Sequence, residues 1–359
     1  MKITFFTSAL SGGGAERVVC NLSSFLAVKG HDVTVLTVGE SAKTYGLNER
    51  VKVLSLEGKS RIKFSALRAL VKLKRLKKYV KNCKDDLIVA FLPKPIKALM
   101  HYKKFAKCPI ILCERCFPKA YDKKTVKSML NAFKSADGTV FQTEEIKKFY
   151  SDKIALKNSM VIPNAVNTGF DFQPFNGERR KVIVAAGRHS EQKNFELLID
   201  AFSEVVKEFS DFTLEIYGKG KLTPKYIERC KELGIENKVL FPGFCEDMSV
   251  RLYGASLFVM SSDYEGIPNA LIEAMAAYTP CVSTDCAGGG ARTLIEDGVN
   301  GIIVPVGDKS ALAKAIKRVL ADKSFAEKLS LNAGKIKEEF SAENIYAEWE
   351  KYFSEIIKK

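Results

Sequence analysis

The segment that most constrains the fold is the one where an apolar strand pattern passes directly into a helical one. Residues 255–260 form an apolar run bounded by turn residues, the pattern of a buried parallel strand. The pattern becomes helical after Pro268, a residue that a first helical turn tolerates, and Gly266 can take up unusual backbone angles in the loop between. A strand, a short loop and a helix in this order predict an α/β fold whose ligands bind at the carboxyl edge of a parallel sheet.

Two glutamates flank an expected anion site in this segment. Glu265 falls in the loop, and Glu273 lies about two turns further on. Backbone N–H groups at the start of the helix, at the positive end of its dipole, suit an anion. Because carboxylates accept hydrogen bonds from sugar hydroxyls, a ligand with an anionic part and a hydroxyl-rich part, such as a nucleotide sugar, fits both features. The alternative is a loop glutamate and a solvated helix glutamate with no ligand.

The spacing E-G-x-P-x-x-x-x-E from Glu265 to Glu273 resembles the signature of the retaining glycosyltransferases of family four, of the type that builds bacterial surface polysaccharides. The resemblance implies an α/β fold of two Rossmann-like domains facing across a cleft, the GT-B arrangement. It also implies sugar transfer from a nucleotide diphosphate donor with retention at the anomeric carbon, with Glu265 in the catalytic site but not as the nucleophile. The donor would contact Gly266, Ile267, Pro268, Asn269, Ala270 and Glu273.

A glycine-rich loop follows the first predicted strand, residues 2–7. Glycines between a strand and a helix let the backbone approach a ligand closely, but a purely structural turn explains the loop equally well. The resemblance implies that Gly13 and Gly14 bring backbone near the diphosphate of the donor. With the strand expected at residues 32–37, the segment predicts a βαβ unit.

Two basic residues in the second half suit a diphosphate. Arg188 stands at a predicted strand end and Lys193 just before a helix start, where each can neutralise phosphate charge, although such residues are usually solvated. They resemble the diphosphate-binding pair of the family, so no metal cofactor is expected. The resemblance also implies that the nucleotide base lies beside Phe244 and Cys245.

Acceptor-side candidates come from the first half. Glu114 and Arg115 follow a predicted strand at the edge where ligands gather. Many relatives carry a Glu-His pair here, and Arg115 stands where the histidine would be. This departure removes a histidine role in sugar or acceptor binding, while an arginine can contact an anionic group.

Length and charge divide the chain. With 359 residues, 46% of them hydrophobic, we expect an N-terminal acceptor domain over 1–167, a linker over 168–181, a donor domain over 182–340 and a helix over 341–359 that returns to the first domain. Residues 1–170 hold 32 Lys and Arg against 13 Asp and Glu, a net charge of +19, whereas residues 171–359 have a net charge of −4. The asymmetry predicts an anionic partner for the first half.

The basic charge is densest over residues 61–81, which contain nine Lys or Arg and no acidic residue. The segment predicts an amphipathic helix on an anionic membrane surface, although a sheet-covering helix with a basic solvated face is an equal alternative. No nucleic-acid-binding motif appears, so we expect no nucleic acid partner.

Without a signal peptide or a long apolar run, we expect a cytoplasmic protein, peripheral at the cytoplasmic face of the membrane. Its nine cysteines would be reduced, without a metal.

We therefore expect a transferase that moves a hexose or N-acetylhexosamine from a nucleotide-diphosphate sugar, with a UDP-sugar as the expected donor, to a glycan or lipid-linked acceptor. Two alternatives remain. A nucleotide-sugar epimerase of related fold would release a free epimer without an acceptor. A noncatalytic basic module that binds membrane or nucleic acid would not consume a nucleotide sugar.

Overall fold

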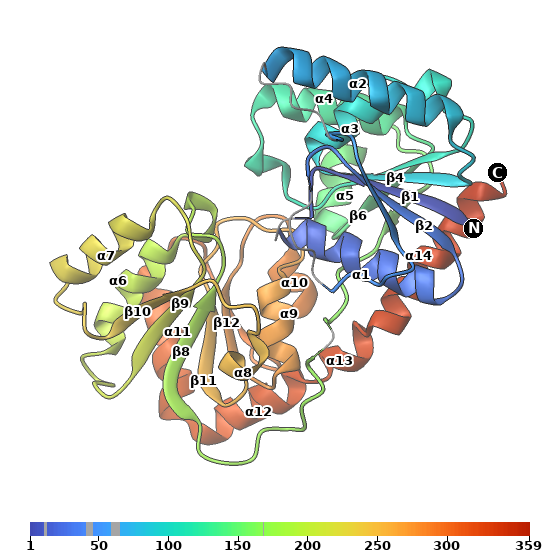
Figure 1. Cartoon of the computed structure of the whole chain (residues 1–359). Coiled ribbons are helices and arrows are strands. Elements are labelled where there is room, and N and C mark those ends of the chain that lie inside the picture. The colour runs from blue at the N-terminus through green and yellow to red at the C-terminus, as the bar shows by residue number, and fades with distance from the viewer. Residues whose placement is uncertain (11–12, 41–45, 59–64, 168) are drawn as a thin grey trace. The chain divides into compact units, whose positions relative to one another are not determined.

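The computed structural model describes residues 1–10, 13–40, 46–58, 65–167 and 169–359. The described chain forms two compact units (Figure 1). Unit 1 comprises Met1–Asn164 and Glu343–Lys359, and unit 2 comprises Ala165–Ala342. The predicted α/β class is confirmed, because each unit is built around a parallel sheet covered by helices.

Unit 1 contains a seven-stranded sheet in the order β3-β2-β1-β4-β5-β6-β7, with parallel pairing between all neighbours. The central strands are apolar and buried, as the sequence pattern predicts for a sheet with both faces covered. The strands are β1 (Lys2–Thr7), β2 (Asp32–Thr37), β3 (Lys52–Ser55), β4 (Leu87–Phe91), β5 (Ile110–Cys113), β6 (Gly138–Phe141) and β7 (Ser159–Val161).

Helices cover both faces of this sheet (Figure 1). They are α1 (Gly14–Val28), α2 (Ser65–Asn82), α3 (Pro93–Met100), α4 (Lys123–Ser135), α5 (Glu144–Ser151) and α14 (Ala342–Ile357), with the short turns η1 (Lys103–Phe105) and η2 (Pro118–Ala120). The C-terminal helix α14 joins this unit through aromatic packing. Trp349, which is fully buried, lies 6.3 Å from Phe91 and 5.5 Å from Phe353 between ring centroids. These aromatic side chains are therefore part of the core of unit 1.

Unit 2 contains a six-stranded sheet in the order β10-β9-β8-β11-β12-β13, again with parallel neighbours. The strands are β8 (Arg180–Ala186), β9 (Thr213–Tyr217), β10 (Val239–Gly243), β11 (Ala255–Met260), β12 (Cys281–Thr284) and β13 (Ile302–Val304). The helices are α6 (Phe195–Val205), α7 (Thr223–Glu232), α8 (Ser249–Leu252), α9 (Asn269–Ala276), α10 (Gly290–Leu294), α11 (Lys309–Ala321), α12 (Lys323–Ala333) and α13 (Ile336–Glu339), with the short turn η3 (Glu191–Lys193).

The segment between the two sheets contains neither helix nor strand from Gly169 to Arg179, and β8 begins at Arg180.

The edge strand β3 was not predicted from the sequence. All four of its residues are exposed, so it lacks the apolar run or the alternation that marks a buried strand.

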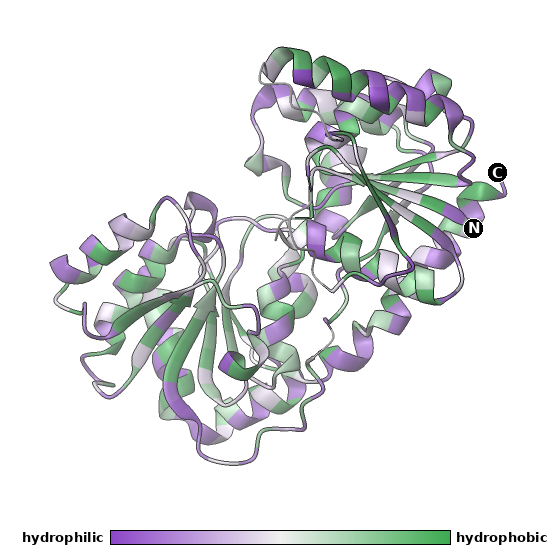
Figure 2. Cartoon of the chain, in the orientation of Figure 1, coloured by the Kyte–Doolittle hydropathy of each residue, from purple (hydrophilic) through white to green (hydrophobic). Residues whose placement is uncertain are grey.

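The basic segment forms a helix, α2, from Ser65 onward, while residues 61–64 of the prediction lie outside the described residues. Its buried side chains are Leu76 and Val80. Its first turns are exposed and carry Leu67, 50% exposed, and Leu70, 56% exposed. Figure 2 shows hydrophobic and hydrophilic residues mixed along this outer helix. Among the described residues, no helix combines the length and the apolar character needed to cross a membrane.

Removing the Phe353 side chain should selectively weaken unit 1. Phe353 is fully buried against Phe5 and Trp349, so Phe353→Ala should lower the free energy of unfolding of this unit by about 3–5 kcal/mol. Trp349 is the single tryptophan of the chain, and its fluorescence during urea unfolding reports the transition. Phe244→Ala, the same change at a side chain that is 58% exposed, is the control and should leave the midpoint unchanged. Equal midpoints for Phe353→Ala and the native protein would contradict this packing role.

Candidate functional site

The glutamate loop lies at the carboxyl edge of the sheet of unit 2. It follows β11, whose neighbours are β8 and β12, so the loops that follow these three strands meet at the same edge. The predicted bounds of β11 are confirmed, and α9 begins at Asn269 with Pro268 as its N-cap residue. The strand-to-helix loop therefore carries Glu265 where the sequence predicts it.

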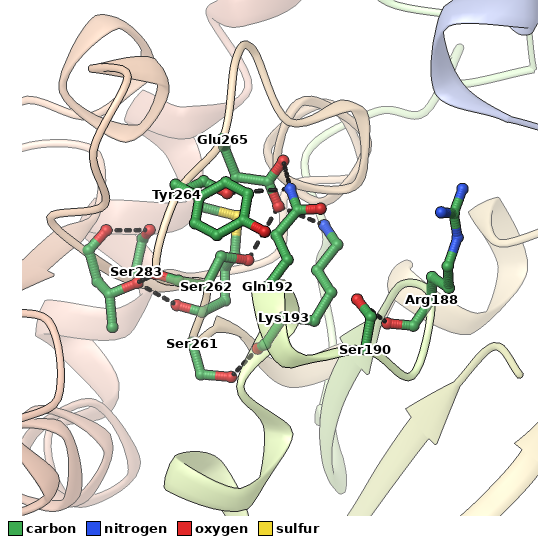
Figure 3. Close-up of polar contacts among 11 residues, drawn as sticks. Arg188, Ser190, Gln192, Lys193, Ser261, Ser262, Tyr264, Glu265 and Ser283 are labelled. Carbon is green, nitrogen blue, oxygen red and sulfur yellow. Dashed lines mark hydrogen bonds and ion pairs between the residues drawn. The ribbon is translucent and has the colours of Figure 1, made fainter. Parts of the chain in front are cut away.

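The Glu265 carboxylate is held by three side chains (Figure 3). Its Oε1 accepts hydrogen bonds from Lys193 Nζ at 2.6 Å and from Ser262 Oγ at 2.9 Å. Its Oε2 accepts one from Gln192 Nε2 at 3.1 Å. The side chains of Lys193 and Glu265 are 16% and 10% exposed, so their ion pair is largely shielded from water. The structure thus brings together two residues predicted separately from the sequence, Glu265 and Lys193.

Four further hydrogen bonds fix the loop after β8 to the loop after β11. Gln192 Nε2 also donates to Tyr264 O at 3.0 Å, and Gln192 O accepts from Asp263 N at 2.9 Å. Ser261 Oγ donates to Lys193 O at 2.9 Å, and Asn194 Nδ2 donates to Asp263 Oδ1 at 2.9 Å. Since these bonds involve backbone groups or short side chains on both loops, the position of Glu265 relative to Lys193 is determined by the fold.

The loop after β12 closes the other side of the glutamate loop. Glu265 N donates to Ala287 O at 2.9 Å. A side chain on Gly290 would place its Cβ 1.7 Å from Gly266 O, a distance that no residue with a side chain can adopt. The backbone of Gly266 therefore packs directly against Gly290, which explains one glycine of the Gly288-Gly289-Gly290 run.

The second glutamate of the motif is buried in α9. Glu273 is 4% exposed, and its Oε1 accepts a hydrogen bond from Asn167 Nδ2 at 2.6 Å. At the start of this helix, Leu271 N and Ile272 N donate to Pro268 O at 3.1 and 3.2 Å. Ile267, Asn269 and Ala270 lie around this first turn, so the predicted donor segment forms the N-terminal end of a helix directly after Glu265.

The other predicted donor residues of unit 2 lie apart from Glu265. Arg188 follows β8 and is exposed, and Figure 3 shows its side chain separate from the Glu265 cluster. Phe244, 58% exposed, and Cys245 follow β10 at the edge of the sheet, with β9 and β8 between them and β11. Cys245 Sγ donates to Asp247 O at 3.1 Å. Contact of these residues with a nucleotide base stays a prediction.

In unit 1 the predicted glycine loop begins α1. Gly13 is the N-cap residue, and its N–H donates to Glu16 Oε2 at 2.8 Å. Gly14 is the first residue of the helix. Glu16 thus caps the helix from within the motif, which is a structural role. Ser11 and Gly12 lie outside the described residues.

The acceptor-side candidates follow β5 in unit 1, at the carboxyl edge of its sheet. Glu114 is 1% exposed, and its oxygens accept hydrogen bonds from Tyr121 at 2.8 Å and Tyr150 at 2.6 Å. Burial raises the pKa of the Glu114 carboxyl. Both of its oxygens are therefore engaged inside the protein, and direct contact of Glu114 with an acceptor stays a prediction.

Arg115, the next residue, also follows β5 at the carboxyl edge of the unit 1 sheet. Its Nη2 donates to Asn164 Oδ1, whereas its Nε and Nη1 are buried without a hydrogen-bond partner among the described residues. Burial lowers the pKa of Arg115 to about 10, so the group is still charged at neutral pH. A half-satisfied buried cation suits an anionic ligand.

A metal centre has no ready donor set in the described part of the chain, where no three His, Cys, Asp or Glu side chains are grouped to hold an ion. The C-x-x-C pair, Cys113 and Cys116, consists of free cysteines. Burial raises the pKa of Cys113, which disfavours the thiolate that metals require.

Three polar residues of the site were not predicted from the sequence: Gln192, Ser262 and Asn167. Each binds a motif glutamate through its side chain. The sequence distance from Gln192 to Glu265 is 73 residues, and from Asn167 to Glu273 it is 106 residues. Polar residues that meet only through the fold leave no local pattern, although Ser262 precedes Glu265 by three residues and could have been proposed as its neighbour.

Two family models match the chain. Residues 12–170 match Glycosyltransferase Family 4, and residues 180–322 match Glycosyl transferases group 1. Together they cover both units, including the Glu265 loop and the Arg188 and Lys193 segment.

Several curated relatives are named as glycosyltransferases. A Campylobacter jejuni protein named GalNAc-alpha-(1->4)-GalNAc-alpha-(1->3)-diNAcBac-PP-undecaprenol alpha-1,4-N-acetyl-D-galactosaminyltransferase is 28% identical over 364 residues, 99% of each chain. The lipopolysaccharide core biosynthesis glycosyltransferase LpsE of Rhizobium meliloti is 28% identical over 92% of each chain. The amylovoran biosynthesis glycosyltransferase AmsD of Erwinia amylovora is 24% identical over 94% of this chain and 95% of its own.

Solved structures agree on the fold. Anabaena Alr3699/HepE, crystallised with UDP-glucose, superposes with a TM-score of 0.85 at 20% identity, covering 99% of this chain and 100% of its own. Staphylococcus aureus TarM, crystallised with UDP among its ligands, gives a TM-score of 0.84 at 16% identity, covering 98% and 99%. With both halves matched and the strand-loop-helix motif in place, the chain belongs to the glycosyltransferases of family four and has the GT-B fold.

Proposed function

We propose that this glycosyltransferase moves a hexose or N-acetylhexosamine from a UDP-sugar to a glycan or lipid-linked acceptor, with retention at the anomeric carbon, in the synthesis of a bacterial surface polysaccharide. The observation that carries the proposal is the shielded Lys193–Glu265 pair at the carboxyl edge of the donor-side sheet. The relatives support the product class, because two of them are named for lipopolysaccharide core and amylovoran biosynthesis.

The donor would take its place around Glu265. The Lys193 ammonium is paired with the Glu265 carboxylate. A diphosphate carries more negative charge than one carboxylate, so it competes for Lys193 and leaves Glu265 oxygens for the hydroxyls of the sugar. Glu273, held by Asn167 through Oε1, would hold the ribose diol. Phe244 and Cys245 would lie beside the base, and Gly13 and Gly14 near the diphosphate.

Departure of the nucleotide diphosphate requires stabilisation of growing negative charge. Arg188, Lys193 and the N-terminal end of α9 would supply it without a metal, because fixed cations and backbone N–H groups act as an oxyanion site. Arg188 is exposed, so it is accessible to a bound phosphate.

Glu265 is a poor nucleophile in this arrangement. Lys193, Ser262 and Gln192 all donate hydrogen bonds to its two oxygens, which reduces the electron density available for attack on a sugar carbon. We therefore propose a same-face reaction in which an oxygen of the departing phosphate takes the acceptor proton, while Glu265 orients the sugar. The proton moves from the acceptor hydroxyl to the diphosphate as the new glycosidic bond forms.

The acceptor would contact unit 1. Arg115 offers two buried N–H-bearing nitrogens that have no partner within the described part of the chain, which suits an acidic group such as the diphosphate of a lipid-linked glycan. The Campylobacter jejuni relative is named for an acceptor linked to undecaprenol through PP, which supports this acceptor class.

A panel of nucleotide sugars tests the donor assignment. Ligands that bind the folded protein raise its thermal midpoint by mass action, because they add about 2.7 kcal/mol to its free energy of unfolding at a concentration about a hundred times the dissociation constant. UDP-sugars should raise the midpoint more than GDP- or ADP-sugars, and slow hydrolysis to UDP should accompany binding. Release of a free epimer without an acceptor would instead indicate an epimerase, and no consumption of any nucleotide sugar would indicate a noncatalytic module.

Replacing the two glutamates should separate turnover from donor binding. Glu265→Gln removes the charge that orients the sugar and should lower kcat, whereas Glu273→Gln weakens the ribose contact and should raise KM for the donor. Loss of a hydrogen bond to a charged group costs about 1.5–3 kcal/mol, a roughly 10- to 150-fold effect on kcat/KM. Steady-state kinetics with the selected UDP-sugar measures both. Native rates in both variants would show that the donor does not bind here.

Arg188→Ala and Lys193→Ala should slow the chemical step by about 100-fold or more, because each removes a cation from the departing diphosphate. Single-turnover rates measure that step. The native rate should be the same in EDTA as in magnesium. Loss of activity on chelation, with recovery on adding a divalent ion, would overturn the metal-free scheme.

We also propose that unit 1 binds an anionic membrane at the cytoplasmic face. The exposed lysines of α2 are Lys74, Lys77, Lys78 and Lys81, and its first turns expose Leu67 and Leu70. Basic and apolar side chains are combined in this way in interfacial helices.

A surface depression of about 480 Å³ adds further basic residues to the surface of unit 1: Lys103, Lys107, Lys157 and Lys359. The acidic side chain in its lining, Asp137, is already paired with Lys103 at 2.8 Å. Lys77 joins the two regions, because its Nζ lies 4.9 Å from the ring centroid of Phe105 in η1.

Charge reversal on α2 tests the membrane contact. Lys74, Lys78 and Lys81 are exposed, whereas Lys72 is paired with the buried Glu57 and is left unchanged. Their joint replacement by Glu should abolish cosedimentation with anionic vesicles, since each basic residue near such a surface contributes about 1 kcal/mol. The control reverses three exposed lysines of unit 2, Lys314, Lys328 and Lys335, and should sediment like the native protein. Equal sedimentation of the α2 variant and the native protein would contradict the membrane contact and favour a soluble acceptor. Vesicle binding that salt does not weaken would contradict an electrostatic contact.

A further inference from the structure

We propose that Gln192 is a positioning residue for Glu265, one that keeps the carboxylate oriented toward the sugar once the donor diphosphate has drawn Lys193 away. This inference rests on the proposed function for its catalytic consequence, and on the geometry of two loops for the contact itself. Gln192 precedes Lys193 in η3, so one short turn delivers both a cation and a neutral donor to the same carboxylate.

Gln192 connects the two loops through three hydrogen bonds. Its Nε2 donates to Tyr264 O at 3.0 Å and to Glu265 Oε2 at 3.1 Å, which uses both N–H bonds of the amide. Its backbone O accepts from Asp263 N at 2.9 Å. The bond to Tyr264 fixes the amide relative to the main chain of the glutamate loop, so the second N–H is directed at Glu265 independently of the ligand.

The two oxygens of Glu265 have different partners. Oε1 is held by Lys193 and Ser262, and Oε2 by Gln192. A bound diphosphate competes for Lys193, but it does not compete for the amide, because the amide is neutral and already satisfied by the loop. Gln192 and Ser262 then remain to hold the carboxylate, and the Gln192 amide is also bound to the main chain of the glutamate loop at Tyr264 O.

A neutral donor is the appropriate group at this position. A second cation would neutralise Glu265 and reduce its attraction for sugar hydroxyls, while an apolar side chain would let the carboxylate rotate. An amide orients one oxygen and leaves the negative charge intact.

The charged and titratable groups around this contact are few. Lys193 pairs with Glu265, and Asp263 is held by Asn194. Cys286, from the loop after β12, has its pKa raised to about 12 by burial and by the Glu265 charge, so it stays protonated in the neutral range. Glu191 in the same turn is exposed.

Gln192→Glu tests the proposal because it keeps the size of the side chain and replaces its two donors by acceptors. The new carboxylate would face Tyr264 O and the Glu265 carboxylate, so its pKa would rise and the pair would share a proton. At low pH that proton restores one hydrogen bond, and at high pH the two carboxylates repel each other. We expect kcat of the variant to fall about 10- to 100-fold below native at pH 8.5 and to recover most of this loss at pH 6, with KM for the donor changing less.

The matched control is Gln173→Glu, the same substitution at an exposed position of unit 2, which should leave the pH profile native. Gln192→Leu should lower kcat at every pH without recovery at low pH. A Gln192→Glu profile parallel to the native one, at any level of activity, would show that Gln192 has only a structural role and would overturn the proposal.

Stability measurements separate this inference from the proposed function. The raised folded-state pKa at residue 192 makes the variant lose stability relative to native as pH rises from the unfolded-state value of about 4.3 through the folded-state pKa. Thermal midpoints between pH 5 and 8 should show that widening difference even if no nucleotide sugar is turned over. A pH-dependent difference without turnover would refute the proposed function alone, whereas a constant difference would refute the contact.

Discussion

The parallel pairing of the described strands is the constraint on which the rest of the structure depends. Because parallel neighbours place their carboxyl ends at one edge, the loops after β8, β11 and β12 meet without any long excursion of the chain. A cation from the first loop and a carboxylate from the second then come within hydrogen-bond distance. Burial of this pair concentrates its electrostatic effect, since few water molecules screen it. The order of the strands therefore determines which loops can contribute residues to the site.

The sequence was sufficient to predict the features that depend on local patterns. The strand before the glutamate loop has its predicted bounds because its apolar run is continuous and ends at polar residues. Glu265 and Lys193 could be proposed individually, since each stands at a strand end or a helix start. Their mutual contact could not be predicted, because the resemblance assigns Lys193 to a diphosphate, and a contact between residues 72 positions apart leaves no local pattern in the sequence. The role of Gln192 could not be predicted for a related reason, because a single uncharged amide in a loop forms no recognisable sequence pattern.

Unit 1 shows where charge and motif arguments from sequence reach their limit. Glu114 and Arg115 are neighbours in the chain but have opposite surroundings: the carboxylate is satisfied by two tyrosines, and the guanidinium is half unsatisfied. Sequence position alone treats them as one pair. The basic helix α2 was predictable as a helix, but the role of Lys72 as the partner of buried Glu57 was not, since Glu57 lies outside the segment.

The close approach of Gly290 to Gly266 has a consequence for how such enzymes can diversify. The contact is made by main-chain atoms on the Gly266 side, so substitutions elsewhere in the two loops leave its shape unchanged, while any side chain at residue 290 would displace the glutamate loop as a whole. A change of sugar preference, in evolution or in the laboratory, must therefore come from side chains carried on this rigid frame. A library intended to broaden donor choice should keep Gly290 and vary the positions around it.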